Sequence, residues 1–175
     1  MKKIFLLLLP LFVACNFQNE GKKTNTEDVN SKKPPQSTVY YLIRHAEKET
    51  GKDPELTDEG KQRAKKWAKI FREVPFKEVY STNYKRSMAT ARPTAKEKGL
   101  SIRSYNPDSL YSEDFKKETH GKTVLVVGHS NTTPAFVNAI TGSKYKNLPD
   151  NEYGALFIVT VYPDGKTDTQ ELFFN

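Results

Sequence analysis

Two histidines and two arginines carry most of the chemistry that the sequence offers. Arg44-His45 ends one apolar run, His129 follows another, and Arg86 lies between them. A neutral imidazole nitrogen attacks phosphorus in line and gives a phosphohistidine that water then hydrolyses. Guanidinium groups present paired donors to phosphate oxygens and stabilise the charge of a phosphoryl group in transfer. The residue types therefore predict phosphoryl transfer, with Arg44 and Arg86 favouring the neutral form of His45 by like-charge repulsion.

The elements that must position these residues can be read from apolar patterning. Strands are predicted over Thr38–Arg44, Glu78–Ser81, residues 100–105 and Thr123–Gly128, and a terminal hairpin over residues 155–162 and 167–174. Helices are predicted after the cap Thr57, along the apolar stripe Ala64, Trp67, Ala68, Phe71 and Val74, and over residues 84–98, 108–118 and Thr132–Thr141. Pro93 is expected to kink the second helix, and Gly99 to end it.

The order of these elements predicts an α/β fold. Strands that alternate with helices favour a mostly parallel sheet covered on both faces, and the terminal hairpin favours an antiparallel edge. Ligands of such sheets bind beyond the carboxyl ends of the parallel strands. Arg44, His45 and His129 lie at that end, so one shared site is expected there.

Four ordered motifs resemble those of the histidine phosphatase superfamily, the phosphoglycerate-mutase-like group. They are Leu42-Ile43-Arg44-His45-Ala46-Glu47, the Leu-Thr-x-x-Gly of residues 56–60, the Ser-x-x-x-x-Arg-x-x-x-Thr-Ala of residues 81–91, and Gly128-His129-Ser130. The resemblance covers the chain from Thr38 onward and implies a three-layer α/β/α sandwich. It also implies that His45 is the nucleophile, that Arg44, Arg86 and His129 bind the transferred phosphoryl group, and that no metal or cofactor is needed.

The roles of other polar residues in these segments have two interpretations. Glu47 contacts substrate phosphate or only orients the loop after the nucleophile, and Asn131 either contacts phosphate or caps the following helix. Thr57 and Gly60 are interpreted as a helix start. Many relatives use a glutamate after the third strand as the proton donor, but residues 104–109 contain no matching motif. Asp108 is then a candidate by position, and Glu113 is another.

The first residues are predicted to form a separate targeting signal. Met1-Lys2-Lys3 precedes the apolar run of residues 4–13, which is too short to span a bilayer as a helix and is typical of a secretory signal peptide. Val13-Ala14-Cys15 resembles a bacterial lipoprotein cleavage site, so Cys15, the only cysteine, is predicted to be acylated. The alternative is an ordinary signal peptide that contains a cysteine. The lipoprotein reading predicts an exported protein, anchored by lipid to a membrane of the bacterial cell envelope on its periplasmic or surface face.

The rest of the chain is predicted to divide into a tether and one domain. Residues 16–37 have almost no apolar content and are predicted to be a disordered tether after the signal peptide of residues 1–15. Residues 38–175 suffice for a single domain with its own core, expected to act as a monomer. The net charge of +7 suits an anionic substrate, but the basic residues are scattered and no nucleic-acid-binding helix is evident.

Hydrolysis of small phosphomonoesters or phosphoamidates is the function that these observations favour. A phosphomutase is the first alternative, but only about 40 residues separate Arg86 from His129, which favours an open site and water as the acceptor. A surface lipoprotein that binds phosphate or other anions without turnover is the second alternative. Such a protein would need the arginines but not the nucleophile, and His45 is retained. The segments 48–55 and 145–153 are expected to line the approach to the site.

Overall fold

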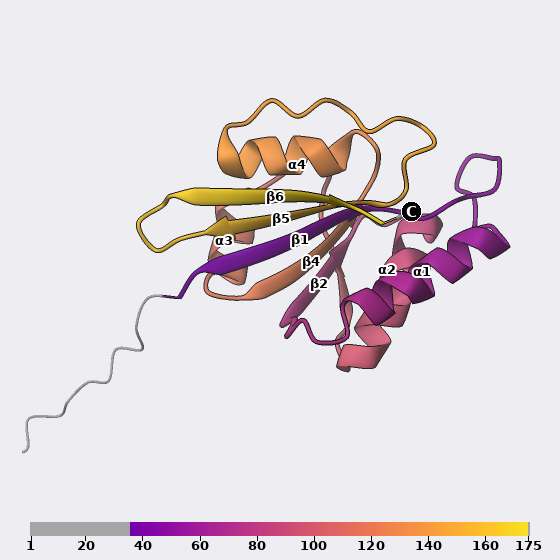
Figure 1. The fold of residues 1–175 in the computed structure, drawn as a ribbon, viewed down its shortest axis with the longest axis horizontal. Coiled ribbons are helices and arrows are strands. Elements are labelled where there is room, and N and C mark those ends of the chain that lie inside the picture. Colours follow the sequence, from indigo (N-terminus) through magenta and orange to yellow (C-terminus); the bar gives the residue numbers. More distant parts are fainter. Residues whose placement is uncertain (1–35, 175) are drawn as a thin grey trace, which may run out of the picture. The chain divides into compact units, whose positions relative to one another are not determined.

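The computed structural model describes residues 36–174, which contain one six-stranded sheet with helices on both faces (Figure 1). The elements are β1 (Thr38–Arg44), α1 (Asp58–Ile70), β2 (Glu78–Ser81), α2 (Lys85–Lys98), β3 (Ile102–Ser104), α3 (Glu113–Thr119), β4 (Thr123–Gly128), α4 (Thr132–Thr141), β5 (Ala155–Val161) and β6 (Thr167–Phe173). The predicted α/β class is confirmed.

The strand order β3-β2-β4-β1-β5-β6 separates a parallel part from an antiparallel edge. β1 pairs with β4 in parallel, and β2 pairs in parallel with both β4 and β3. β5 runs antiparallel to β1, and β6 pairs with β5 as the second strand of the predicted hairpin. In this register Arg44 lies opposite Gly128, and Ser81 lies opposite Val127. The carboxyl ends of β1, β2 and β4 therefore meet at one edge of the sheet.

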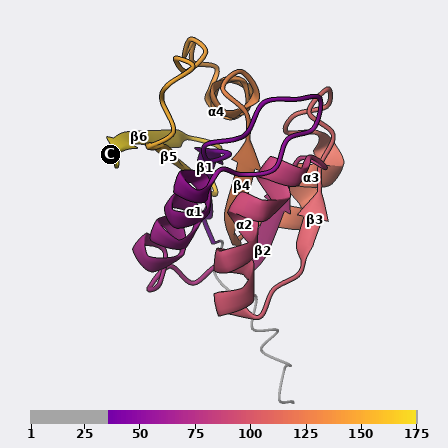
Figure 2. The same cartoon turned by 90° about the vertical axis from the view of Figure 1, so that its right-hand side faces the viewer.

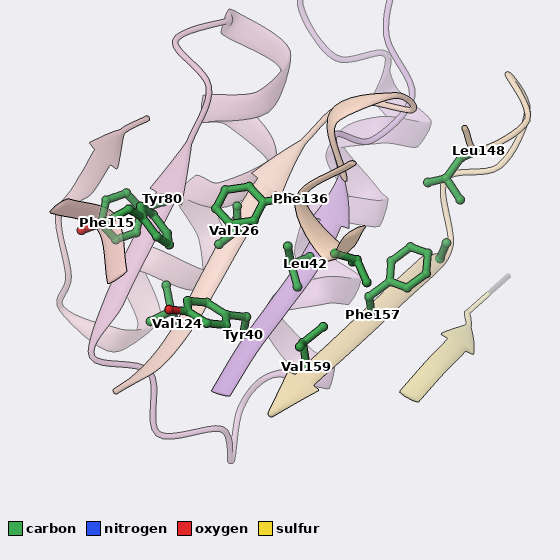
Figure 3. Packing of buried hydrophobic residues seen from close by; sticks show 12 residues of the cluster. Tyr40, Leu42, Tyr80, Phe115, Val124, Val126, Phe136, Leu148, Phe157 and Val159 are labelled. Atoms are coloured by element: carbon green, nitrogen blue, oxygen red, sulfur yellow. The ribbon is translucent and has the colours of Figure 1, made fainter. Parts of the chain in front are cut away.

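Alternation along the strands builds a core on each face of the sheet. Tyr40 and Leu42 of β1 point to the face covered by α3 and α4, whereas Ile43 points to the face covered by α1 and α2. Figure 2 shows α1 and α2 on one side of the sheet and α4 on the other. Figure 3 shows the first of these clusters, in which Phe115 of α3 and Phe136 of α4 pack on the strands. The result is the expected three-layer sandwich.

The predicted helix signals are largely confirmed. The Thr57 side chain accepts the Gly60 N–H at 3.0 Å, so Thr57 caps α1. α2 continues through Pro93 and ends at Gly99, which has the left-handed φ of 65°. A proline keeps its preferred φ inside a helix, although it leaves one carbonyl without a helical donor.

Two weak elements are shorter than predicted. α3 begins at Glu113 rather than at residue 108, because the Ser112 hydroxyl accepts the Phe115 N–H and sets the first turn. β3 covers three residues only, since its partner β2 is short and pairs with it over three positions. Val74 lies beyond the end of α1, but it still packs against the core cluster on that face.

The predicted signal peptide with Cys15, and most of the predicted tether, lie outside the described residues. Within residues 36–174, no helix is long and apolar enough to cross a membrane. The division into signal peptide, tether and domain stays a prediction.

Candidate active site

The ends of β1 and β4 bring the two histidines together. The His45 N–H donates to the Gly128 carbonyl at 2.9 Å, which continues the parallel ladder by one residue past the strand. His129 is the residue after Gly128, and the two imidazole centroids are 5.3 Å apart. Two residues separated by more than eighty positions are thus adjacent, as expected for the carboxyl edge of a parallel sheet.

Backbone geometry fixes the tautomer of His45. Its Nδ1 lies 2.8 Å from the Ala46 carbonyl oxygen, which can only accept a hydrogen bond. Nδ1 therefore carries the proton, and in the neutral ring Nε2 carries the lone pair. The ring itself is buried but contributes to the wall of a cavity. His45 thus presents one basic nitrogen whose identity is set by its neighbour in the chain.

Burial is the main reason why His45 is neutral. Burial, together with the smaller effects of His129, Arg86 and Arg44, lowers the pKa of His45 to about 3 against the opposing effect of the Ala46 hydrogen bond. The expectation that the arginines favour the neutral imidazole is correct in sign. Desolvation, which sequence reasoning left out, is the larger cause.

His129 is held by a residue on each of its ring nitrogens. Arg86 Nη2 donates to Nδ1 at 3.3 Å, so the neutral ring carries its proton on Nε2, which lies 2.9 Å from the Thr82 hydroxyl oxygen. Burial, followed by the charges of Arg86 and Arg44, lowers the pKa of His129 to about 4. Both histidines of the site are therefore neutral near pH 7.

Arg44 also anchors the segment after α4. Its Nη1 donates to the carbonyls of Pro149, Asp150 and Glu152 at 2.9 to 3.0 Å. Its guanidinium lies 4.1 Å from the ring centroid of Tyr153, which supplies a cation–π contact. One guanidinium thus holds residues 149–153 beside the nucleophile through hydrogen bonds from its Nη1 and through its contact with the Tyr153 ring.

Both arginines keep a buried donor without a protein partner. Among residues 36–174, the Nε–H groups of Arg44 and Arg86 donate a hydrogen bond to no acceptor. A buried charged donor left unpaired costs free energy, so native structures seldom keep one without a ligand or a water to satisfy it. Two such donors, on arginines that line the same cavity as His45, suit the oxygens of a bound oxyanion.

The site opens into a cavity of about 790 Å³. Its wall contains the four predicted phosphoryl-transfer residues and side chains from both predicted approach segments. The lining residues are Arg44, His45, Lys48, Tyr84, Arg86, Pro107, Asp108, Leu110, His129, Ser130, Asn131, Thr132, Ala135, Asn147 and Asp150. Lys48 comes from the first approach segment, and Asn147 and Asp150 come from the second.

The remaining predicted site residues differ in their placement. Asn131 lines the cavity and makes no side-chain cap for α4, which favours a ligand contact over capping. Asp108 also lines the cavity, and its backbone N–H is bonded to the Asn106 side chain at 2.9 Å. Glu47 does not line the cavity, because its carboxylate pairs with Arg63 Nε at 2.6 Å. This pairing favours the alternative in which Glu47 orients the loop after the nucleophile.

Residues that the sequence analysis left unassigned complete the support of the site. Thr90 accepts the Ala46 N–H at 2.9 Å and donates to the Arg86 carbonyl at 2.8 Å, so it ties the nucleophile loop to α2. Tyr84 places its ring 4.6 Å from the Arg86 guanidinium. Thr90 belongs to the Thr-Ala motif, which was a signal for it, whereas nothing in the sequence marks Tyr84.

Within the described part of the chain, no group of three or more histidine, cysteine, aspartate or glutamate side chains is arranged to hold a metal ion. The residues of the site are instead two neutral imidazoles and two guanidiniums, which are suited to an anion.

A sequence model of the histidine phosphatase superfamily (branch 1) matches residues 40–106. This range contains Arg44, His45 and Arg86, and His129 lies beyond it. No curated protein sequence matches the chain significantly.

Solved structures share the fold over most of the chain at low sequence identity. The protein histidine phosphatase SixA, solved with tungstate, is 17% identical with a TM-score of 0.62, covering 77% of this chain and 96% of that one. A phosphoglycerate mutase from Bacillus anthracis is 14% identical with a TM-score of 0.62, covering 79% and 93%. A mycobacterial glucosyl-3-phosphoglycerate phosphatase is 10% identical with a TM-score of 0.57, covering 80% and 99%.

Proposed function

We propose that the chain is a phosphatase that acts through a phosphohistidine on His45. The premise is its similarity to the histidine phosphatase superfamily, which the sequence model and the structural neighbours support and whose members are phosphatases and mutases. The observation that carries the proposal is the environment of one atom. His45 Nε2 is the lone-pair nitrogen of a buried neutral ring, and Arg44 and Arg86, which line the same cavity, each keep an unpartnered Nε–H donor.

The first step transfers the phosphoryl group to the protein. The lone pair of His45 Nε2 attacks phosphorus, a P–N bond forms, and the P–O or P–N bond to the leaving group breaks with its electron pair going to that group. The phosphorylated ring keeps the Nδ1 proton and carries positive charge, which the Ala46 carbonyl stabilises. The guanidiniums of Arg44 and Arg86 stabilise the charge on the equatorial oxygens.

The second step restores the histidine. A water oxygen attacks phosphorus, the P–N bond breaks, and its electron pair returns to Nε2. The water proton passes to the departing phosphate or to solvent, so the ring is again neutral. Water is favoured as the acceptor over a hydroxyl because only about 40 residues join Arg86 to His129, which leaves no long insertion to enclose a substrate.

A leaving group that is a strong base, such as the alkoxide of a phosphomonoester, needs a proton as it departs. Asp108 is the carboxyl group that lines the cavity on the segment after β3, so we assign the proton to it when the substrate is a phosphomonoester. Phosphoamidates need less assistance. A small phosphorylated molecule of either class suits the cavity volume of about 790 Å³.

Turnover by the full-length chain, purified in mild detergent, tests the proposal. We expect hydrolysis of an aryl phosphate in the presence of a chelator, inhibition by vanadate, and no turnover by His45→Asn. Asparagine retains a donor near the position of Nδ1 but lacks the nucleophilic nitrogen. If the folded parent binds phosphate but turns over neither aryl phosphate nor phosphoamidate, the chain is an anion-binding protein instead.

We also propose that the chain is exported and acylated at Cys15 in the bacterial cell envelope. The support is the Val13-Ala14-Cys15 sequence after the apolar run of residues 4–13. Metabolic labelling with a palmitate analogue tests it: label is expected on the parent and none on Cys15→Ser. A parent that carries no label and is secreted free of the membrane would leave only an ordinary signal peptide.

A further inference from the structure

The loop between His45 and α1 reaches across to the start of α2. Lys48 and Leu56 form a bridge, and the Glu49 N–H donates to the Glu55 carbonyl at 2.9 Å, so residues 49–55 form a closed loop. Asp53 lies in this loop and contacts the first turn of α2. The loop that follows His45 is therefore attached to the start of α2 as well, and none of the four sequence motifs indicates this contact.

Asp53 makes two contacts at the first turn of α2. Its Oδ1 accepts the backbone N–H of Lys85 at 3.1 Å, and it lies 3.7 Å from Arg86 Nη1. Tyr84, the N-cap residue by position, makes no side-chain cap. Asp53 thus supplies from a distant loop the capping acceptor that the helix lacks locally, and it places a carboxylate beside the Arg86 side chain.

The orientation of the Arg86 guanidinium is then determined at two nitrogens. Nη1 faces Asp53, Nη2 donates to His129 Nδ1 at 3.3 Å, and the ring of Tyr84 lies against the guanidinium. Nε is the buried nitrogen that has no protein partner among the described residues. Because the guanidinium is planar, fixing Nη1 and Nη2 also fixes the direction in which the Nε–H points.

We propose that Asp53 is a positioning residue that sets the orientation of Arg86 for the transferred phosphoryl group. The inference rests on the proposed function for its kinetic consequence, whereas its effect on anion binding stands without turnover. Asp53 acts through Arg86 and through the start of α2, and it does not line the phosphoryl cavity.

Positioning and simple charge repulsion predict opposite results. Asp53 is half-exposed at 40%, so solvent screens the repulsion between its carboxylate and a bound anion. Misorientation of a donor to the transition state is not screened in this way, and small displacements cost up to about a hundredfold in rate. Loss of the carboxylate is therefore expected to lower activity, although it makes the region more positive.

Asp53→Asn separates the two contacts of Asp53. Asparagine caps a helix about as well as aspartate, so the bond from the Lys85 N–H is retained while the ion pair with Arg86 is lost. Glu55→Gln is the matched control. It removes an ion pair between the same loop and the same helix turn, Glu55 with Lys85 at 3.3 Å, but Glu55 does not contact Arg86.

The test uses the full-length chain in detergent, with aryl-phosphate kinetics and orthovanadate binding as separate readouts. For Asp53→Asn we expect kcat to fall about tenfold, with a much smaller change in KM, because the lost orientation matters most in the transition state. Vanadate, which mimics that state, should bind about tenfold more weakly. Glu55→Gln should leave kcat and the vanadate affinity within about twofold of the parent.

Three kinetic or binding results would overturn the inference, and a fourth includes a melting temperature. They are an unchanged kcat in Asp53→Asn, a rise in activity or vanadate affinity, or an equal loss in Glu55→Gln. If the parent itself shows no turnover, the proposed function fails, and vanadate binding still decides the role of Asp53. If Asp53→Asn binds vanadate as the parent does but melts at a lower temperature, the residue is only a structural link between the loop and α2.

Discussion

The two neutral histidines make stability depend on pH in a way that can be calculated. Burial lowers the pKa of His45 to about 3 and that of His129 to about 4, whereas a histidine in the unfolded chain has a pKa near 6.5. The unfolded chain therefore binds more protons as the pH falls below about 6.5. The stability that the neutral rings provide is present above that pH and is lost as the pH falls toward the folded pKa values.

The magnitude follows from the unfolded state alone at a mildly acidic pH. One pH unit below the unfolded pKa, each histidine that stays neutral in the folded protein lowers the free energy of unfolding by about 1.4 kcal/mol. His45 and His129 together give about 3 kcal/mol between about pH 7.5 and pH 5.5. This figure requires only that both folded pKa values lie well below 5.5, as they do.

Urea denaturation of the parent and of the double variant His45→Asn/His129→Asn at the two pH values measures this difference. The parent is expected to lose about 3 kcal/mol more than the double variant. All other titratable groups are common to the two proteins, so the comparison isolates the two histidines. Equal losses would refute the reasoning. So would imidazole NMR resonances in the folded parent that titrate between pH 5.5 and 7.5, a test that does not depend on the variant folding.

Three further substitutions test the supporting contacts. Gly60→Ala would place a Cβ 2.0 Å from the Glu47 carbonyl oxygen, so thermal denaturation should show a loss of about 3 kcal/mol. Asn131→Ala removes no helix cap, so stability should change by less than about 0.5 kcal/mol while KM rises; a loss of 1 kcal/mol or more, about that of a cap, would contradict this. Arg63→Ala leaves the Glu47 carboxylate unpaired and should cost about 2 kcal/mol, against little change for Arg72→Ala, whose pair with Glu97 is exposed.

The strong strands and helices could be predicted because local signals agree with the packing. Thr38–Arg44 and Thr123–Gly128 are continuous apolar runs, and both are central strands covered on two faces. Thr57 caps the start of α1 with its side chain, and Gly99 ends α2 with a left-handed backbone conformation, so each residue type marks its own helix boundary. β3 and α3 lack such agreement, so their ends depend on neighbours, namely the length of β2 and the Ser112 cap.

The reacting residues could be predicted, but much of what holds them could not. His45 and His129 converge because parallel strands end at one edge, which strand order alone implies. Arg44 is held by the carbonyl oxygens of Pro149, Asp150 and Glu152, and every residue type has a carbonyl, so no sequence pattern marks these acceptors. Asp53 and Arg86 meet through a loop closure between residues 33 positions apart. Their pairing depends on the tertiary structure and cannot be predicted from secondary-structure propensity or from sequence spacing.

The central claim is that His45 Nε2 carries the phosphoryl group between substrate and water. Rapid quenching of the full-length chain with an aryl phosphate, followed by peptide mass spectrometry and ³¹P NMR, detects such an intermediate directly. We expect an acid-labile, base-stable phosphoryl group on His45 at Nε2, absent from His45→Asn. Turnover with the label on Nδ1, on His129 or on a hydroxyl would contradict it.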